Sequence, residues 1–128
     1  MNTDASIEEF EGDDWGDPSP DATRLVATVL RLRRRPVRTL GVEDLRVLAG
    51  QAVGLAVVVP LALDILERDP LAEGDFYPGD LLSAVLRAPA DYWRAHPAQA
   101  ARLRAVDTES VDDGQLKTEI SAFGAAGY

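Results

Sequence analysis

The spacing of apolar residues along the chain predicts a series of short helices and no sheet. Residues 21–35 carry apolar side chains at helical spacing, with Asp21 as the expected N-cap and Pro36 as the expected stop. The apolar face of this helix consists of Leu25, Val26, Val29, Leu30 and Leu32. A second helix is expected after Gly41, and Gly50 and Gly54 mark its end.

Four further helices are expected after this break. The first ends near Asp69 and has Pro60 in its first turn, where the missing N–H group does no harm. The next is expected to be capped by Asp80. Another begins at Pro89 and stops at His96, before a last helix over residues 98–106.

The expected fold is therefore all-α: a compact bundle of about five to six short helices with an irregular acidic loop and mobile termini. Three regions are distinguished by composition, an acidic N-terminal segment at residues 1–20, an all-helical domain at 21–106 and a polar tail at 107–128. The tail is rich in glycine and polar residues, so it is expected to be mobile, with one weak helical turn near residues 116–120.

Acidic residues dominate the charge of the chain and are distributed unevenly. The net charge is −9, which repels nucleic acids and anionic membranes and favours encounter with basic partners. Residues 1–21 hold eight acidic side chains and no basic one, whereas residues 22–46 hold seven arginines against two acids. We expect the arginine-rich run RLRRRPVR to pair with the acidic N-terminal segment, or to lie at a solvated helix end, rather than to bind nucleic acid.

Several classes of chemistry have no support in the sequence. The absence of cysteine excludes disulfides, thiolate metal ligands and cysteine nucleophiles, and it fits a cytoplasmic protein. The N-terminus lacks the features of a signal peptide, and the longest uncharged run, residues 47–63, is too short and too interrupted to span a membrane. No glycine-rich phosphate loop or serine nucleophile motif is present, and the only histidine, His96, is expected to be a helix-end residue. No enzymatic activity and no cofactor are therefore predicted.

Two segments combine acidic residues with aromatic ones, EGDDWGDP near the N-terminus and DPLAEGDFYPGDLL in the middle of the chain. Aromatic anchors flanked by charge suit a protein–protein interface, because they supply affinity and fast encounter. Trp15 and Phe76 either pack inward or contact a partner, whereas Glu73, Asp75 and Tyr77 are expected to be exposed. The predicted partner-binding residues are Asp13, Asp14, Trp15, Glu73, Asp75, Phe76, Tyr77 and Asp80.

These two segments, together with VEDLRVLAGQAVGL, VPLALDILERDPLAEGDFYPGDLLSAVL and DYWRAHP, resemble the CdiI-type immunity proteins of bacterial contact-dependent growth inhibition systems. The resemblance covers residues 8–106, and DPLAEGDFYPGDLL is its most specific part. It implies a small cytoplasmic protein that binds and neutralises the C-terminal toxin domain of a large surface effector. Many such toxins are nucleases, which are commonly basic, so an acidic inhibitor is complementary to them in charge.

Two other functions stay open at this point. A small carboxylate-based metal-dependent hydrolase would need Glu73, Asp75 and His96 near one another, although the acids lack the spacing of an EF-hand loop. A regulatory adaptor would use the acidic N-terminus to mimic a polyanion, and deletion of residues 1–12 would abolish its activity.

Overall fold

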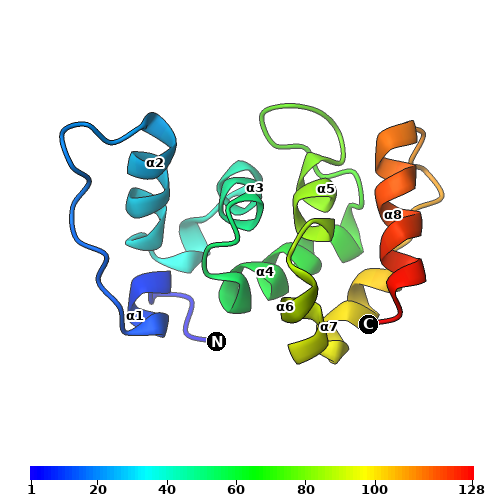
Figure 1. Cartoon of the computed structure of the whole chain (residues 1–128), viewed down its shortest axis with the longest axis horizontal. Helices are drawn as coiled ribbons and strands as arrows, with labels where there is room; N and C mark the ends of the chain where they lie inside the picture. The colour runs from blue at the N-terminus through cyan, green and yellow to red at the C-terminus, as the bar shows by residue number, and fades with distance from the viewer.

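Short helices are arranged side by side along the longest axis of the molecule and are joined by irregular segments (Figure 1). The computed structural model describes all 128 residues and contains no strand, only two isolated bridges. The helices are α1 (Ile7–Glu11), α2 (Arg24–Arg33), η1 (Val37–Thr39, a 3-10 turn), α3 (Val42–Gly50), α4 (Leu55–Arg68), α5 (Asp80–Leu86), α6 (Ala90–Ala95), α7 (Pro97–Arg104) and α8 (Gly114–Ala126). The all-α class is confirmed, but the expected number of helices was too small. None of these helices has both the length and the apolar composition that crossing a bilayer requires.

The core lies where α3, α4 and α5 meet. Helix α3 packs against both α4 and α5, and α8 covers another side of α5. The side chains at the centre are aliphatic and fully buried, which is the usual way in which short amphipathic helices are stabilised. They include Leu48 of α3, Leu63 and Leu66 of α4, and Leu81 and Val85 of α5.

Helix α1 was not predicted, although its N-terminus has a recognisable signal. The Ser6 hydroxyl accepts a hydrogen bond from the Glu9 N–H, and the Glu9 carboxylate accepts one from the Ser6 N–H, which forms a capping box. Ile7 is completely buried and lies over Gly54, where a Cβ atom added to the glycine would stand only 2.8 Å from the Ile7 Cγ2 atom. A single buried isoleucine thus ties this five-residue helix to the start of α4.

Helix α8 replaces the weak helical turn that was expected in the tail, so that prediction is wrong. Asp113 caps the helix by accepting the Leu116 N–H at 2.8 Å. Leu116 and Phe123 are buried, and their spacing of seven residues places both on one face of the helix. Glu119 adds a 2.8 Å ion pair with Arg87, at the end of α5.

Two element boundaries differ from the predictions. Thr23, not Asp21, caps α2, because its hydroxyl accepts the Val26 N–H at 3.1 Å. Helix α4 begins five residues before Pro60, so this proline lies inside the helix rather than in its first turn and removes one backbone hydrogen bond there. The break at Gly50 and Gly54 is confirmed.

Helix α2 buries only part of the apolar face expected of it. Val29, Leu30 and Leu32 are buried, whereas Leu25 and Val26 in its first turn are 43% and 47% exposed. Among the helices, α2 packs mainly against α3. Its first turn therefore leaves two aliphatic side chains uncovered.

Replacing Leu116 by alanine is expected to lower the free energy of unfolding by about 2–5 kcal/mol, because it opens a cavity between α8 and the core. Lys117→Ala, which alters an exposed side chain of the same helix, is the control and should change stability by less than about 0.5 kcal/mol. Urea denaturation followed by circular dichroism measures both. Equal stability of the two variants would show that α8 does not dock as described.

Candidate partner-binding surface

The acidic loop, residues 69–79, is shaped from beneath by one buried carboxylate. Asp80, the first residue of α5, is only 3% exposed. Its Oδ1 atom accepts the Gly74 N–H at 2.6 Å, and its Oδ2 atom accepts the N–H groups of Phe76 at 3.1 Å and Tyr77 at 3.5 Å. Three backbone donors of the loop thus converge on one side chain, which lies below the surface that its neighbours present.

Two charged residues of α3 complete this support. Arg46 donates two hydrogen bonds of 2.6 Å to Glu43, and its Nε atom lies 3.8 Å from Oδ2 of Asp80. Glu43 in turn accepts the Asp75 N–H at 2.9 Å. The hydrogen bonds from Arg46, together with the one from the Asp75 N–H, hold the pKa of Glu43 below its usual value. The Arg46 guanidinium also lies 4.4 Å from the centre of the Phe76 ring, within the range of a cation–π contact.

Glycine is required at two positions of the loop. A Cβ atom on Gly74 would lie 2.5 Å from Oε1 of Glu43 and 3.0 Å from Oδ2 of Asp80. Gly79 has a φ of +92°, and a Cβ atom there would lie 2.7 Å from the Leu116 Cδ2 atom. Gly79 also occupies the N-cap position of α5, so the prediction that Asp80 is the cap is wrong.

The outer side of the acidic loop exposes two carboxylates and two aromatic rings. The carboxylates of Glu73 and Asp75 are exposed and form neither an ion pair nor a side-chain hydrogen bond. Phe76 is 69% exposed despite its contact with Arg46, and Tyr77 is partly exposed. Neither Phe76 nor Tyr77 folds into the core, so the loop presents two free negative charges beside two aromatic rings.

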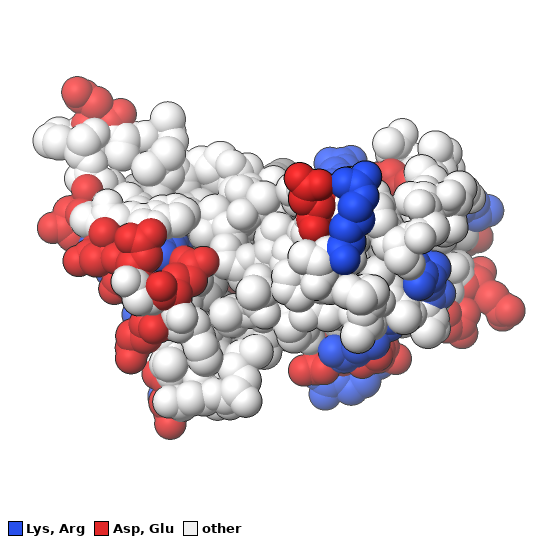
Figure 2. All heavy atoms as spheres, turned by 60° about the horizontal axis from the view of Figure 1, so that its bottom comes forward, with Lys and Arg blue, Asp and Glu red and all other residues white.

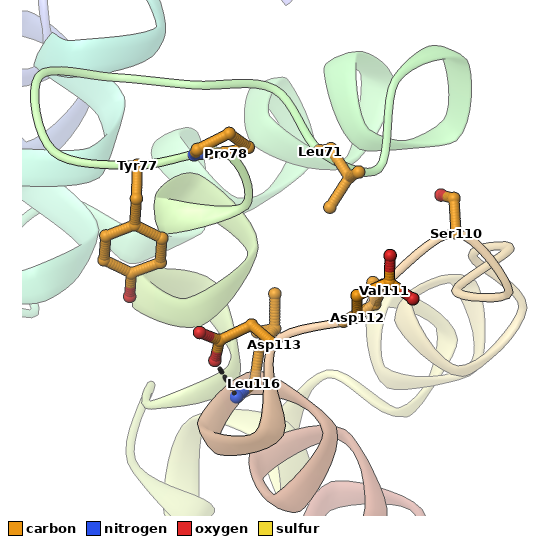
Figure 3. Close-up of a pocket in the computed structure, with 8 residues that line it drawn as sticks. All are labelled: Leu71, Tyr77, Pro78, Ser110, Val111, Asp112, Asp113 and Leu116. Atoms are coloured by element: carbon orange, nitrogen blue, oxygen red, sulfur yellow. Dashed lines mark hydrogen bonds between the residues drawn. The ribbon is translucent and has the colours of Figure 1, made fainter.

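The loop separates two hollows. On one side Tyr77 and Pro78 face residues 110–116 across a cavity of about 250 Å³, with Leu71 and Leu116 on its walls (Figure 3). The carboxylate of Asp113 points toward the start of α8, where it caps that helix (Figure 3).

On the other side a groove of about 670 Å³ separates the acidic loop from α2. Asp75 and Phe76 form one wall, Arg24 and Arg31 of α2 lie on the opposite wall, and Val47 of α3 also lines the groove. Neither arginine forms an ion pair within the chain. The groove is therefore open, charged on both walls and large enough to receive a segment of another protein.

The N-terminal acidic-aromatic segment, residues 11–17, is organised around a buried arginine, Arg33. Arg33 is only 1% exposed and donates to Oε1 of Glu11 at 2.6 Å and to the Asp13 carbonyl at 3.0 Å. Its guanidinium lies 3.8 Å from the centre of the Trp15 ring. Trp15 is nevertheless 47% exposed, and its indole N–H donates to the Asp13 carboxylate at 3.1 Å.

Arg34 holds the rest of this segment. It pairs with Asp17 at 2.8 Å and more loosely with Glu8 and Asp14, and it donates to the Gly16 carbonyl. The Gly16 N–H, and to a lesser extent Arg34, lower the pKa of Asp14. The predicted pairing of the arginine-rich run with the acidic N-terminal segment is confirmed. Figure 2 shows acidic side chains gathered at the end of the molecule formed by this segment.

The structure does not join the two acidic-aromatic segments into one patch. Trp15 lines a hollow against one side of α2, and Phe76 lines the groove on another side. Leu25 contributes to both hollows and therefore lies between them.

Arg33, Glu43 and Arg46 were not singled out from the sequence, although they hold both segments in place. For Glu43 and Arg46 the available signal was their spacing of three residues on a predicted helix, which is typical of a surface ion pair. Nothing in the sequence separates Arg33 from its neighbouring arginines, because its role depends on its burial.

His96 is a helix-end residue, as predicted. Its Nδ1 atom lies 2.8 Å from the Tyr92 carbonyl, and its ring stacks on that of Tyr92 with centroids 4.1 Å apart. The structure brings together no group of three or more histidine or carboxylate side chains that could hold a metal ion. The arrangement of Glu73, Asp75 and His96 that a metal-dependent hydrolase would need is therefore not formed.

Comparison with known proteins identifies a family. Residues 9–103 match the model of a family described as CDI immunity proteins, a range that covers most of the chain and runs from α1 into α7. Both acidic-aromatic segments lie within it, and the resemblance noted from the sequence is confirmed. No curated protein matched the chain with significance.

Asp80→Ala is expected to lower the free energy of unfolding by about 1–3 kcal/mol, because it leaves buried N–H donors of the loop without an acceptor. Asp75→Ala is the matched control, because it removes an unpaired carboxylate of the same loop and should change stability by less than about 0.5 kcal/mol. Thermal unfolding and amide exchange at Gly74 and Phe76 provide the two measurements. Unchanged protection of these amides in Asp80→Ala would contradict the role of Asp80.

The pKa of Glu43 predicts how stability responds to acid. Because the pKa is lower in the folded than in the unfolded protein, the stabilisation is present above the usual value of 4.5 and is lost as the pH falls through the folded-state pKa. Glu43→Gln should therefore be less stable than the wild type at pH 7, with a smaller difference at acidic pH. Melting temperatures between pH 7 and pH 3 test this, with Glu109→Gln as an exposed control. Parallel curves for wild type and Glu43→Gln would contradict it.

Proposed function

The chain belongs to the family of CDI immunity proteins, and we propose that it binds and neutralises the toxin domain of a cognate contact-dependent growth inhibition system. It acts by stoichiometric protein–protein contact rather than by catalysis. The toxin domain is the C-terminal part of a larger effector, and the immunity protein meets it in the cytoplasm of the producing cell and its siblings.

One observation carries the proposal for the docking site, namely the exposed face of the acidic loop. The carboxylates of Glu73 and Asp75 are exposed and unpaired, and Phe76, 69% exposed, adds a large apolar surface beside Asp75 on the wall of the groove. Because Asp80, Glu43 and Arg46 already fix the loop backbone, binding does not have to order it. A preformed, charged and aromatic surface of this kind supports tight and fast association.

The proposed toxin is a basic nuclease. The net charge of −9 and the unpaired acids of the loop are complementary to a protein that must bind phosphate groups. The loop would cover the substrate cleft of the toxin or another surface on which its activity depends. In that position Glu73 and Asp75 would replace phosphates as partners of the basic residues of the toxin.

Reversing the charge of the loop should slow association. The Glu73→Lys/Asp75→Lys variant is expected to bind the toxin domain encoded immediately upstream with an association rate reduced by about tenfold or more at low salt. Its association should also depend less on salt than that of the wild type. Surface plasmon resonance at low and moderate salt measures both effects, and growth rescue of cells that express the toxin reports the biological result.

Asp91→Lys/Glu109→Lys is the matched control, because it changes the net charge by the same amount at exposed positions outside the loop. It should retain near wild-type salt dependence and rescue. Equal effects of the two variants would mean that only the overall charge matters and that the acidic loop is not the docking face. Absence of both complex and rescue for the wild-type protein would overturn the proposed function itself.

A further inference from the structure

A second surface, distinct from the acidic loop, exposes apolar side chains around a hollow. Trp15, Leu25 and Val26 are three of the seven large apolar side chains that are exposed in this chain, and all three line the same hollow of about 180 Å³. Val29 and Val53 lie in its buried part. We call this feature the α2 hollow.

The exposed apolar side chains of the α2 hollow lie where burial is the rule. Leu25 and Val26 lie on the apolar face of an amphipathic helix, at positions that normally pack against a core. Trp15 is held beside them by Arg33 with about half of its surface in contact with water. Single exposed apolar residues are common, but a cluster around a concavity is typical of an interaction site.

The charge around the α2 hollow selects the kind of partner. Residues 1–21, of which Trp15 lines the hollow, contain eight acids and no base, and only Arg33, Arg34 and Arg38 pair with them. Five negative charges of this segment therefore remain unbalanced. A second copy of the chain would bring the same acids against one another, so self-association through this surface is disfavoured. A partner with basic residues around an apolar side chain is favoured instead.

We propose that the α2 hollow is a second anchor for the toxin domain and receives an apolar side chain that is flanked by lysine or arginine. This inference rests on the proposed function. Leu25 lines both the α2 hollow and the groove beside the acidic loop, so the two sites adjoin at this residue and one partner can reach both. The acidic loop would govern the rate of encounter, and the α2 hollow would govern how long the complex lasts.

The two roles have different kinetic signatures. Loss of a buried apolar contact acts mainly on the dissociation rate, whereas loss of an exposed charge acts mainly on the association rate and its salt dependence. Leu25→Ala/Val26→Ala is the informative variant, because alanine suits an exposed position in a helix and should leave the fold intact. Phe10→Ala, which truncates an exposed apolar side chain of α1 outside the hollow, is the matched control.

The experiment measures binding of these variants to the toxin domain by surface plasmon resonance at two salt concentrations, with circular dichroism to check folding. Leu25→Ala/Val26→Ala is expected to raise the dissociation rate about tenfold or more, with little change in the association rate or the salt dependence. Phe10→Ala should bind like the wild type. Analytical ultracentrifugation of the free protein should show a monomer.

Three results would overturn the inference while leaving the proposed function in place. One is an unchanged dissociation rate for the folded double variant when the wild type binds tightly. Another is an equal effect of Phe10→Ala. The third is a wild-type dimer that Leu25→Ala/Val26→Ala converts to a monomer, because a second copy of the chain would then occupy the hollow. Failure of the wild type to bind the toxin domain at all would instead remove the proposed function on which the inference rests.

Discussion

The buried carboxylate of Asp80 is the constraint on which the middle of this structure depends. A carboxylate removed from water is costly unless it is hydrogen-bonded and paired, and here three loop N–H groups and the nearby Arg46 fulfil that need. The same contacts join α3, the acidic loop and α5. The packing of α3 against α5 forms the centre of the core. The loop has no regular secondary structure, but these hydrogen bonds fix the position of its backbone.

The N-terminal segment repeats this arrangement with different residues. Arg33, like Arg46, pairs with a glutamate and lies against an aromatic ring of which about half or more stays exposed. In both segments a cation supports an aromatic residue from the protein side and leaves the outer side of the ring free. Two chemically similar surfaces thus flank α2, one beside the groove and one beside the α2 hollow.

The helical class and the order of the central helices followed from the spacing of apolar residues, because local periodicity determines which face of a helix is buried. The pairing of the arginine-rich run with the acidic N-terminus followed from charge alone. Helix α8 was underestimated because the polar residues and glycines of the tail outweighed the helical spacing of Leu116, Ile120 and Phe123, all three of which pack against the core. Helix α1 was missed although Ser6 and Glu9 form a capping box, since one buried residue gives no periodic pattern.

The candidate surface was predictable in composition but not in the role of each residue. Exposure of Glu73 and Asp75 agrees with the expectation for charged loop residues, and Asp80, of the same residue type as Asp75, is buried. The difference arises from backbone groups that approach Asp80 only in the folded loop. The exposure of Leu25 and Val26 could not be predicted either, because helical spacing marks an apolar face without showing whether another element covers it.

The close approach of Gly79 to Leu116 shows which part of the chain the acidic loop depends on. Gly79 ends the acidic loop directly above Leu116 of α8, yet the family match stops at residue 103, before α8 begins. A fragment trimmed to the matched range would keep every residue of the loop and lose the helix on which one end of it rests. The part of the chain that supports the acidic loop therefore extends through α8, beyond the range that sequence similarity defines.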